Sequence, residues 1–461
     1  MKRKICTLVS LIIIILVVVI KIYNGNTKEV VLNKNSIGSS NLVSMMIETA
    51  EGSGKYEAGT SSSYPTDGYL FNESLSGCEN GSKMEWDNDS QNVVIKGNIS
   101  DKCYAYFDVY TLAKVKSVVA DVTGTKLDVS VDAQDGTGKV TKYYYSIDDG
   151  RNYKESSVNT YTFTNLSKGT YKVKTYVVDS NGKKSNSLDD SAEIIGPTLA
   201  SHVISQYTGT QGGNGLYYHD SSLVNGAGDN SYRYAGANPN NYVCFGSEAT
   251  TCPSNNLYRI IGVFGDYVKV IKSNTIGNYA WNSTNSSNTW ASVSINTYLN
   301  GTFLTSLGNY SNKIATFTWK VGGNGTNAIR DVTASVAYQN EIVNPVTTNT
   351  SNGLTDFSGK VGLMYVSDYG FAASSSAWST TLYNYSSSSV SSVNWLYLDD
   401  YQWTITRVPS STTIAYSIYN NGMVEYVGLN GTYSIRPAFY FTPKVVYLSG
   451  TGTFSDPLRV V

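Results

Sequence analysis

The chain has 461 residues, a formal net charge of −1 and only 15% charged residues. A charge so close to zero provides no broad field for nucleic acid or acidic lipid, so we expect no nucleic-acid partner. Polarity comes instead from Ser, Thr, Asn, Gly and 38 Tyr, which favour half-exposed strands and turns. The composition therefore predicts a mainly β protein of several domains.

The first segment, Met1 to Tyr23, predicts a membrane anchor. Three basic residues, Lys2 to Lys4, precede the apolar run of a helix over Ile5 to Ile22, which is about 27 Å long and close to the thickness of a hydrocarbon core. The basic flank predicts a cytoplasmic N-terminus and an extracellular bulk, hence a single-pass protein of the cell membrane. The alternative is a cleaved signal peptide, which would need small residues where the bulky Tyr23 precedes Gly25.

After the anchor we expect a spacer over residues 24–63, with a short helix at Asn41 to Glu48. Residues 64–112 predict a small β module, because short apolar runs alternate with turn residues. The strands expected in this module are Tyr69 to Phe71, Lys83 to Trp86, Val93 to Lys96 and Cys103 to Val109.

Four cysteines follow the membrane segment in two close pairs. An even number of cysteines in an exported chain indicates disulfides, so we expect Cys78 to pair with Cys103 and Cys244 with Cys252. The alternatives are four free thiols or a metal site, although neither spacing resembles that of a zinc knuckle.

Residues 113–196 predict a β-sandwich. Apolar residues alternate along successive runs, and Asp135-Gly136, Asp149-Gly150 and Asn181-Gly182 stand between the runs, where tight turns are needed. The stretch from Tyr161 to Gly182 resembles the last strands of immunoglobulin-like or fibronectin type III-like modules of bacterial surface proteins. That resemblance implies a spacer domain.

Residues 197–461 predict the largest domain, of the α+β class. We expect helices at Leu199 to Tyr207 and between Trp290 and Asn312, where apolar residues recur every four positions. The strands expected here are Leu257 to Phe264, Tyr267 to Ile271, Ile314 to Val321, Lys360 to Val366, Gln402 to Val408, Ile414 to Ile418, Met423 to Val427, Tyr433 to Phe441 and Val445 to Leu448.

Four stretches of this domain carry a family resemblance: Leu257 to Ile271, Lys360 to Gly370, Trp403 to Arg407 and Ser434 to Phe441. They resemble an uncharacterised family of surface proteins from gut Firmicutes and their relatives, and Tyr64 to Asp108 resembles the N-terminal module of the same family. The order of a Trp strand, an Asn-Gly hairpin and an Arg-Pro-apolar strand is also similar to the C-type-lectin-like fold, including relatives of the formylglycine-generating enzyme.

The lectin-like resemblance implies a fold and no site. The formylglycine-generating enzyme needs a cysteine pair late in its domain, and this chain has no Cys after Cys252. The loops that bind sugar through calcium in lectins have no counterpart at Asn344-Pro345-Val346 or Trp281-Asn282-Ser283. Fold similarity alone therefore assigns no activity.

Other catalytic and metal-binding patterns are equally absent from the sequence. The two histidines, His202 and His219, have no further obvious ligands near them, and no Gly-x-Ser-x-Gly or phosphate-binding loop occurs. A glycosidase needs two carboxylates across a sugar, and Asp368, Asp399 and Asp400 cannot be paired from sequence. We therefore expect no catalytic residue, no metal and no cofactor.

Two arginines are candidate functional residues. Arg407 and Arg436 each stand in an apolar strand, where an unpaired charge is costly. One interpretation is a structural salt bridge to Asp368, Asp399 or Glu341. The other is a pocket in which one guanidinium holds an anionic ligand.

Aromatic residues supply the remaining candidate site. Six of the seven Trp lie after residue 197, and most can be explained by core packing. Where aromatic residues fall among Ser, Asn and Asp we expect loops, which commonly carry recognition of glycans or protein surfaces. The candidate ligand-binding residues are Trp378, Tyr383, Trp395, Tyr397 and Tyr401, together with Arg407 and Arg436.

Two functions are consistent with these observations. The first is a membrane-anchored bacterial cell-surface protein that displays a non-catalytic ligand-binding or adhesion domain on a β-sandwich spacer. The second is an exported enzyme that processes glycans or peptides with its C-terminal domain. An aromatic groove would favour the first, and a deep pocket with two convergent titratable groups would favour the second.

Overall fold

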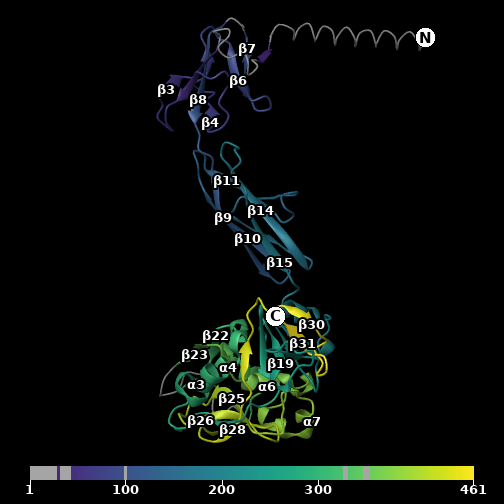
Figure 1. Cartoon of the computed structure of the whole chain (residues 1–461). Helices are drawn as coiled ribbons and strands as arrows, with labels where there is room; N and C mark the ends of the chain where they lie inside the picture. The colour runs from purple at the N-terminus through teal and green to yellow at the C-terminus, as the bar shows by residue number, and fades with distance from the viewer. Residues whose placement is uncertain (1–28, 32–42, 98–100, 325–330, 346–353) are drawn as a thin grey trace, which may run out of the picture. The chain divides into compact units, whose positions relative to one another are not determined.

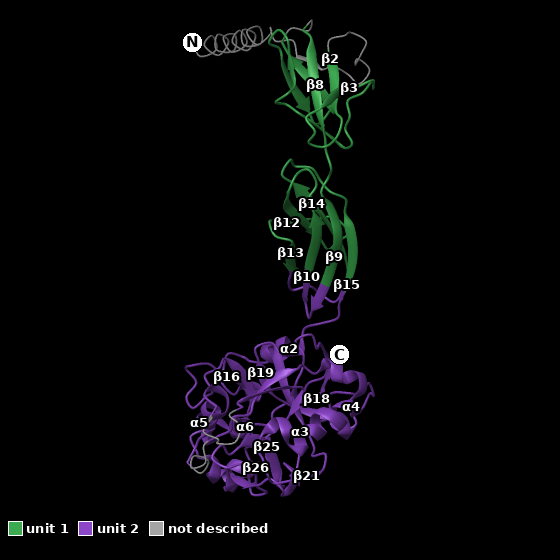
Figure 2. Ribbon diagram, turned by 90° about the vertical axis from the view of Figure 1, so that its left-hand side faces the viewer, with its two compact units in different colours: residues 1–120, 129–162, 171–192 green, residues 121–128, 163–170, 193–461 purple. Residues whose placement is uncertain are grey.

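The computed structural model is mainly β (Figure 1). The predicted anchor, Met1 to Tyr23, lies outside the described residues, and within the described part no helix is long and apolar enough to cross a membrane. The chain divides into two compact units, residues 1–120, 129–162 and 171–192, and residues 121–128, 163–170 and 193–461 (Figure 2). The structure describes residues 29–31, 43–97, 101–324, 331–345 and 354–461.

The N-terminal module consists of two sheets, with the strand orders β1-β7-β6 and β3-β2-β8-β4, and β5 pairs with β8. Its core contains Met45, Met84, Val93, Ile95 and Phe107. The strands are β1 (Glu29–Val31), β2 (Val43–Glu48), β3 (Tyr56–Ala58), β4 (Tyr69–Phe71), β5 (Gly77–Cys78), β6 (Lys83–Asp87), β7 (Asn92–Lys96) and β8 (Cys103–Val109).

Two predictions about this module need correction. The segment Asn41 to Glu48 does not form the expected helix, because Val43–Glu48 is strand β2, which pairs in parallel with β8 and antiparallel with β3. This pairing buries Met45 and Glu48, and such long-range contacts outweigh local helix propensity. Three strands of the module therefore come from the segment that the sequence predicts to be a spacer.

The middle domain is the predicted β-sandwich, with sheets ordered β13-β10-β9 and β12-β11-β14-β15. Its burial alternates along the strands as the sequence predicts: Val129 and Val131 of β10 and Val173 and Val177 of β14 are buried. The strands are β9 (Lys114–Thr123), β10 (Lys126–Gln134), β11 (Val140–Ser146), β12 (Lys154–Ser156), β13 (Thr160–Phe163), β14 (Gly169–Asp179) and β15 (Leu188–Ile194).

The rest of the chain, which we call the head, is built on a nine-stranded sheet with the path β24-β29-β20-β19-β18-β31-β30, to which β16 and β17 attach at β19. Its strands are β16 (Leu216–His219), β17 (Ser231–Tyr234), β18 (Tyr242–Cys244), β19 (Leu257–Phe264), β20 (Tyr267–Lys272), β24 (Val361–Gly362), β29 (Ala438–Tyr440), β30 (Tyr447–Ser449) and β31 (Leu458–Val460).

Two further sheets complete the head, one ordered β21-β28-β25-β26-β27 and one formed by the hairpin β22-β23. One large core of buried apolar residues holds the head together, and a smaller apolar cluster contains Ala334, Phe371 and Trp378. These strands are β21 (Asn278–Ala280), β22 (Phe317–Lys320), β23 (Asp356–Gly359), β25 (Gln402–Arg407), β26 (Ile414–Ile418), β27 (Val424–Gly428) and β28 (Thr432–Ser434).

The helices of the head are short. Those between Trp290 and Asn312 form as expected, and so does the one that begins at Leu199, where Thr198 caps the helix through the Ser201 N–H. They are α2 (Leu199–Ser205), η1 (Gly213–Gly215), η2 (Ser254–Asn256), η3 (Trp290–Ser292), α3 (Ser294–Tyr298), η4 (Leu299–Phe303), α4 (Leu304–Ser306), η5 (Gly308–Lys313), α5 (Ala334–Tyr338), η6 (Gln339–Val343), α6 (Val366–Ala372), η7 (Ser375–Ala377), η8 (Leu382–Ser386) and α7 (Ser388–Ser391).

Two predicted strands of the head are interrupted. The stretch Lys360 to Val366 leaves the sheet after Gly362, because Asp368 and Glu341 accept hydrogen bonds from the backbone that opens helix α6. The stretch Tyr433 to Phe441 is divided into β28 and β29 around Pro437, which has no N–H to offer a sheet. Strands β16 and β17 lie between Tyr207 and Leu257, a region for which the sequence predicts no strand.

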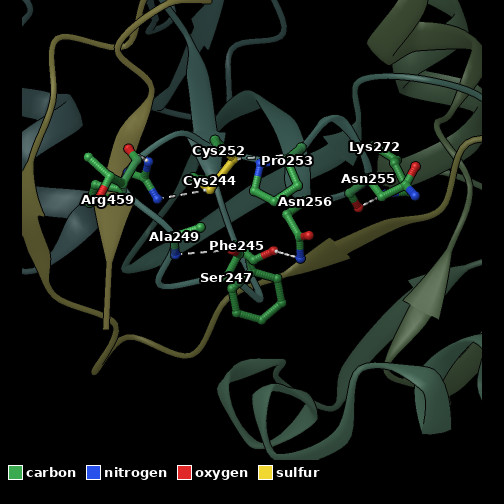
Figure 3. Close-up of a disulfide and its surroundings, with 11 residues drawn as sticks. Cys244, Phe245, Ser247, Ala249, Cys252, Pro253, Asn255, Asn256, Lys272 and Arg459 are labelled. Carbon is green, nitrogen blue, oxygen red and sulfur yellow. Dashed lines mark hydrogen bonds between the residues drawn. A yellow bond between two sulfur atoms is a disulfide. The ribbon is translucent and has the colours of Figure 1, made fainter.

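Both expected disulfides are present. Cys78 and Cys103 face each other across β5 and β8, and Cys244 in β18 is joined to Cys252 eight residues later. Figure 3 shows that Arg459 of β31 approaches the second disulfide, where its guanidinium lies 3.3 Å from Cys244 Sγ. The loop closed by the second disulfide is therefore also held by Arg459 of strand β31.

Candidate functional site

The two tryptophans predicted to form a contact surface are buried in the core of the head. Trp378 donates its indole N–H to the carbonyl of Ala373 at 3.0 Å, and Trp395 donates to the carbonyl of Tyr234 at 2.8 Å. The prediction that these residues stand on exposed loops is therefore wrong. Short helical turns and tight packing fold this stretch inward, and each buried indole finds a backbone acceptor.

The three tyrosines of the same prediction are half-buried. Tyr397 donates its hydroxyl to the carbonyl of Asn420 at 2.7 Å, and Tyr401 packs against Tyr419 and Tyr433. Tyr383 lies in η8 and is also half-buried. These contacts secure the neighbouring loops of the head.

The two candidate arginines bind backbone oxygens instead of carboxylates. Arg407 donates to the carbonyls of Gly322 at 3.0 Å and Leu354 at 3.3 Å, and Arg436 donates to the carbonyl of Leu396 at 2.6 Å. In the described part of the chain neither forms the predicted ion pair with Asp368, Asp399 or Glu341. Burial lowers the pKa of Arg436 to about 9, which still leaves it charged at neutral pH.

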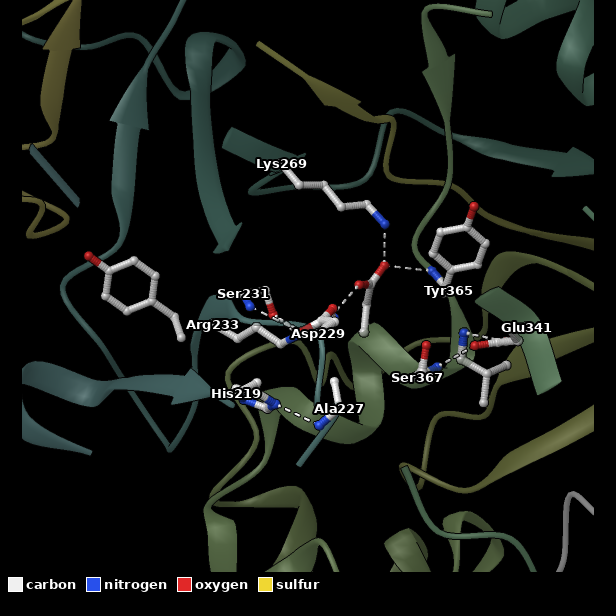
Figure 4. A network of polar contacts seen from close by, with 12 residues as sticks. His219, Ala227, Asp229, Ser231, Arg233, Lys269, Glu341, Tyr365 and Ser367 are labelled. Carbon is white, nitrogen blue, oxygen red and sulfur yellow. Dashed lines mark hydrogen bonds and ion pairs between the residues drawn. The ribbon is translucent and has the colours of Figure 1, made fainter. Parts of the chain in front are cut away.

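Both histidines pack against neighbouring residues of the head. His202 stacks on Tyr447, with ring centroids 3.5 Å apart. His219 is fully buried, and its Nδ1 accepts the Ala227 N–H at 3.1 Å (Figure 4). Burial lowers the pKa of His219 well below its usual value. Among the described residues there is no group of three His, Cys, Asp or Glu side chains that could hold a metal ion.

A cavity of about 490 Å³ in the head is the candidate site. It lies between one face of the nine-stranded sheet, the helices α5 and α6 and the hairpin β22-β23. Thr316, Thr318 and Lys320 stand at its rim. The walls are aromatic and are formed by Phe264, Tyr267, Phe317, Tyr338, Tyr365 and Tyr440.

The floor of this cavity carries a chain of four charges, of which three are buried and the fourth, Asp229, is partly buried; Figure 4 labels Lys269, Arg233 and Asp229. Lys269 of β20 contacts Asp368 of α6, with 2.5 Å between Nζ and Oδ2. Arg233 of β17 lies between two carboxylates, 2.7 Å from Asp229 and 3.7 Å from Asp368. Two positive and two negative groups thus neutralise one another at the bottom of the cavity.

The electrostatics of the floor follow from burial and from these pairs. Burial raises the pKa of Asp229, but the Arg233 guanidinium and hydrogen bonds from Ser231 outweigh it and bring the pKa to about 2. Burial lowers the pKa of Lys269, against the attraction of Asp368. Asp229 is therefore a carboxylate throughout the physiological range, and the floor is a set of fixed donors and acceptors.

Glu341 supports the floor from behind. Its carboxylate accepts the N–H groups of Val366 and Ser367 at 3.1 and 3.0 Å and the hydroxyl of Thr406 at 2.5 Å. Burial raises the pKa of Glu341 to about 7, although these hydrogen bonds oppose the shift. Its contacts fix the first turn of α6, which carries Asp368.

Sequence reasoning missed most of this site. It named Glu341 only as a salt-bridge partner, and Asp368 as a salt-bridge partner or as a carboxylate that could not be paired with another. It named neither Arg233 nor Lys269. A signal was present, because Lys269 stands in an apolar strand between Val268 and Val270, as Arg407 does in its own strand. The same argument, that a charge in an apolar strand needs a partner, applies to Lys269.

Comparison with known proteins gives limited similarity. No family model matches the sequence. No curated protein matches it either. A solved structure of the PKD1 domain of Vibrio anguillarum Epp is 17% identical and covers 19% of this chain and 99% of its own, with a TM-score of 0.17.

Two further solved structures are of β modules. A fibronectin type-III domain of human fibronectin type III domain containing protein 3 is 19% identical and covers 18% of this chain and 85% of its own, with a TM-score of 0.15. Carbohydrate-binding modules from the β-sandwich superfamily are 16% identical over 36% of this chain and 56% of theirs, with a TM-score of 0.18. The C-type-lectin-like fold of the head stays a prediction.

Proposed function

We propose that this is a cell-surface protein, anchored by Met1 to Tyr23, whose head binds a sugar ring in the aromatic cavity without transforming it. The observation that carries the proposal is the combination of aromatic walls with a floor of charges that are already paired. Aromatic rings offer apolar faces to the C–H groups of a sugar, and paired charges offer donors and acceptors to its hydroxyls.

The charge balance of the site favours a neutral ligand. Lys269 and Arg233 are matched by Asp368 and Asp229, and at the rim Lys320 pairs with Asp356 at 2.7 Å. A ligand with a net charge would disturb these pairs and leave a buried charge without its partner, which is costly. A polar, uncharged molecule can add hydrogen bonds without doing so.

The size of the cavity favours a small unit. Pockets for small molecules in proteins occupy roughly 300–1,000 Å³, and this cavity of about 490 Å³ lies in the lower part of that range. It suits one or two sugar rings better than a flat protein surface. A terminal sugar of a glycan can enter while the remainder stays outside.

The proposed absence of catalysis has support in the acidity of the floor. A glycosidase needs a carboxylic acid that can donate a proton near the working pH. Asp229, with a pKa of about 2, cannot be that acid at neutral pH. Arg233 donates a hydrogen bond to Asp229 and keeps it an acceptor, which suits binding.

The decisive experiment is a glycan array probed with the full chain in detergent, followed by calorimetry with the best sugar. We expect binding to neutral sugars, and Phe317→Ala should weaken it about tenfold, because one stacking face is lost. Tyr279→Ala is the matched control: Tyr279 is a half-buried aromatic outside the cavity, packed on Tyr298. It should leave affinity unchanged.

Two outcomes would overturn the proposal. If no neutral sugar binds, or if Phe317→Ala binds as well as wild type, the cavity is not the site. If any arrayed glycan is cleaved by the wild-type chain, the exported-enzyme alternative takes its place. Anchoring is tested separately: protease added to intact cells should remove the head, whereas a mature N-terminus near Gly25 in the culture supernatant would contradict it.

A further inference from the structure

Lys269 and Asp368 form an unusually close and enclosed pair. The Lys269 amine lies 2.5 Å from Asp368 Oδ2, and the two side chains are only 1% and 3% exposed. The residues are 99 positions apart in sequence, one in strand β20 and the other in helix α6. The pair therefore joins two elements that are distant along the chain.

Aromatic rings surround the amine. Lys269 Nζ lies 4.2 Å from the centroid of the Tyr365 ring, 5.2 Å from that of Trp319 and 5.4 Å from that of Tyr440. These rings pack around the amine, and the two side chains are only 1% and 3% exposed, so the nitrogen has little freedom to move away from the carboxyl.

Both oxygens of the Asp368 carboxyl face donors. Oδ2 accepts the Tyr365 backbone N–H at 2.8 Å, and Oδ1 lies 3.7 Å from the Arg233 guanidinium (Figure 4). Donors at a carboxyl oxygen stabilise the negative charge that develops there when a nucleophile attacks the carbon. Glu341 holds the adjacent backbone N–H groups of Val366 and Ser367, which fixes the carboxyl in place.

We propose that Lys269 and Asp368 become joined by an intramolecular amide bond between Nζ and Cγ. The ammonium first gives one proton to Oδ2, the oxygen that it contacts, which leaves a neutral amine beside a neutral acid. The nitrogen then attacks Cγ, and Oδ1, which faces the Arg233 guanidinium, carries the negative charge of the tetrahedral intermediate. Oδ2 takes a second proton from the nitrogen and leaves as water toward the cavity while Oδ1 becomes the amide oxygen, so an ammonium and a carboxylate yield one amide and one water.

The ionisation of the site supports the first step. Burial lowers the pKa of Lys269, which makes the neutral amine easier to reach. Proximity lowers the remaining barrier to amide formation, because a nucleophile held against its target reacts as if at very high concentration. No oxidant, metal or activated donor is required.

The cross-link is independent of the proposed sugar binding. Once the amide has formed, Arg233 and Asp229 still neutralise each other, so the floor stays free of net charge. The bond would close a loop from β20 to α6 and make the head resistant to unfolding by heat or force. A device of this kind suits a protein that faces the outside of a cell without the protection of the cytoplasm.

The experiment is the mass of the intact wild-type chain after denaturation, with all disulfides reduced and alkylated. We expect the greater part of the protein to be lighter than its sequence by the mass of one water. Proteolysis should then yield a branched peptide that joins the segments around Lys269 and Asp368. If wild-type protein incubated for days between pH 5 and 8 keeps the full mass and gives two separate peptides, the proposal is wrong.

Variants assign the bond to this pair. Lys269→Arg keeps the charge but cannot form the amide, so it should restore the full mass. Lys272→Arg is the matched control: Lys272 is another buried lysine of β20, and its amine contacts the carbonyl of Asn255. This variant should stay one water lighter. A loss of water that persists in Lys269→Arg would place the dehydration elsewhere and overturn the assignment.

Discussion

Trp395 donates its indole N–H to the backbone carbonyl of Tyr234, 161 residues earlier in the chain. The same indole ring lies 4.5 Å from the guanidinium carbon of Arg259. Trp395 thus joins the loop before β25 to strands β17 and β19 at one point. A residue that the sequence suggested for ligand contact is instead a central packing residue of the head.

We therefore expect Trp395→Ala to unfold the head more easily, without a specific effect on binding. Truncation of a buried Trp should lower the free energy of unfolding by about 3–5 kcal/mol. Urea titration followed by Trp fluorescence measures this change. Phe454→Ala serves as control, because Phe454 is 70% exposed and its loss should cost less than about 1 kcal/mol. An equal loss of unfolding free energy in the two variants would contradict the packing role of Trp395.

Asp229 should make the head lose stability in acid. Its pKa is about 2 in the folded state and 3.8 in the absence of the fold, so the unfolded chain takes up a proton first as the pH falls. The contribution is fully present above pH 4 and is lost between pH 4 and 2, and it amounts to about 2 kcal/mol. Urea titrations at several pH values in this range measure the free energy of unfolding. This free energy should depend less steeply on pH in Asp229→Asn than in wild type. An unchanged slope would show that another group is responsible.

Glu341 should have the opposite effect. Its pKa is raised from 4.5 to about 7, so the folded head holds a proton that the unfolded chain has already released. Stability should fall as the pH rises from about 4.5 to 7, by about 3 kcal/mol, and then level off. Thermal unfolding at pH 5 and pH 8 compares the two conditions. In Glu341→Gln the difference between them should shrink, and a persistent difference would contradict this origin.

The two disulfides should contribute unequally. The chain-entropy model gives about 3.5 kcal/mol for the pair with a sequence separation of 25 and about 2.5 kcal/mol for the pair with a separation of 8. Cys78→Ser with Cys103→Ser should raise hydrogen exchange throughout the N-terminal module, whose core is small. Cys244→Ser with Cys252→Ser should affect only the surroundings of β18. Faster hydrogen exchange throughout the head in the second variant would show that the stability of the whole head depends on its disulfide.

Local pattern predicted the strands whose partners are close in sequence. The hairpin β19-β20 turns at Gly265-Asp266, and the alternation of β10 and β14 was visible without any structure. Strand β2 could not be recognised in this way, because its partner β8 lies some 60 residues away and pairs in parallel. Its short apolar run fits a helix and a strand equally well until the partner is known.

The sequence could mark Lys269 as a charge in need of a partner, but for a related reason it could not assemble the candidate site. Its charged floor combines Arg233, Lys269 and Asp368, which come from three separate elements, and the sequence contains no spacing that links them. The aromatic residues misled in a different way, since Trp378 and Trp395 stand among polar residues yet turn inward. Composition can tell that aromatic residues are abundant, and only the fold decides which of them face a cavity.

Strand β31 has a consequence for how the head is made. It covers residues 458–460 and pairs in parallel with β18, more than 200 positions earlier, so that it lies inside the sheet between β18 and β30. A chain is synthesised from its N-terminus, so this sheet cannot be completed while residue 458 is still in the ribosome. The two earlier β domains can close as they appear, whereas the head must wait, exposed to chaperones and proteases, until residue 458 has emerged.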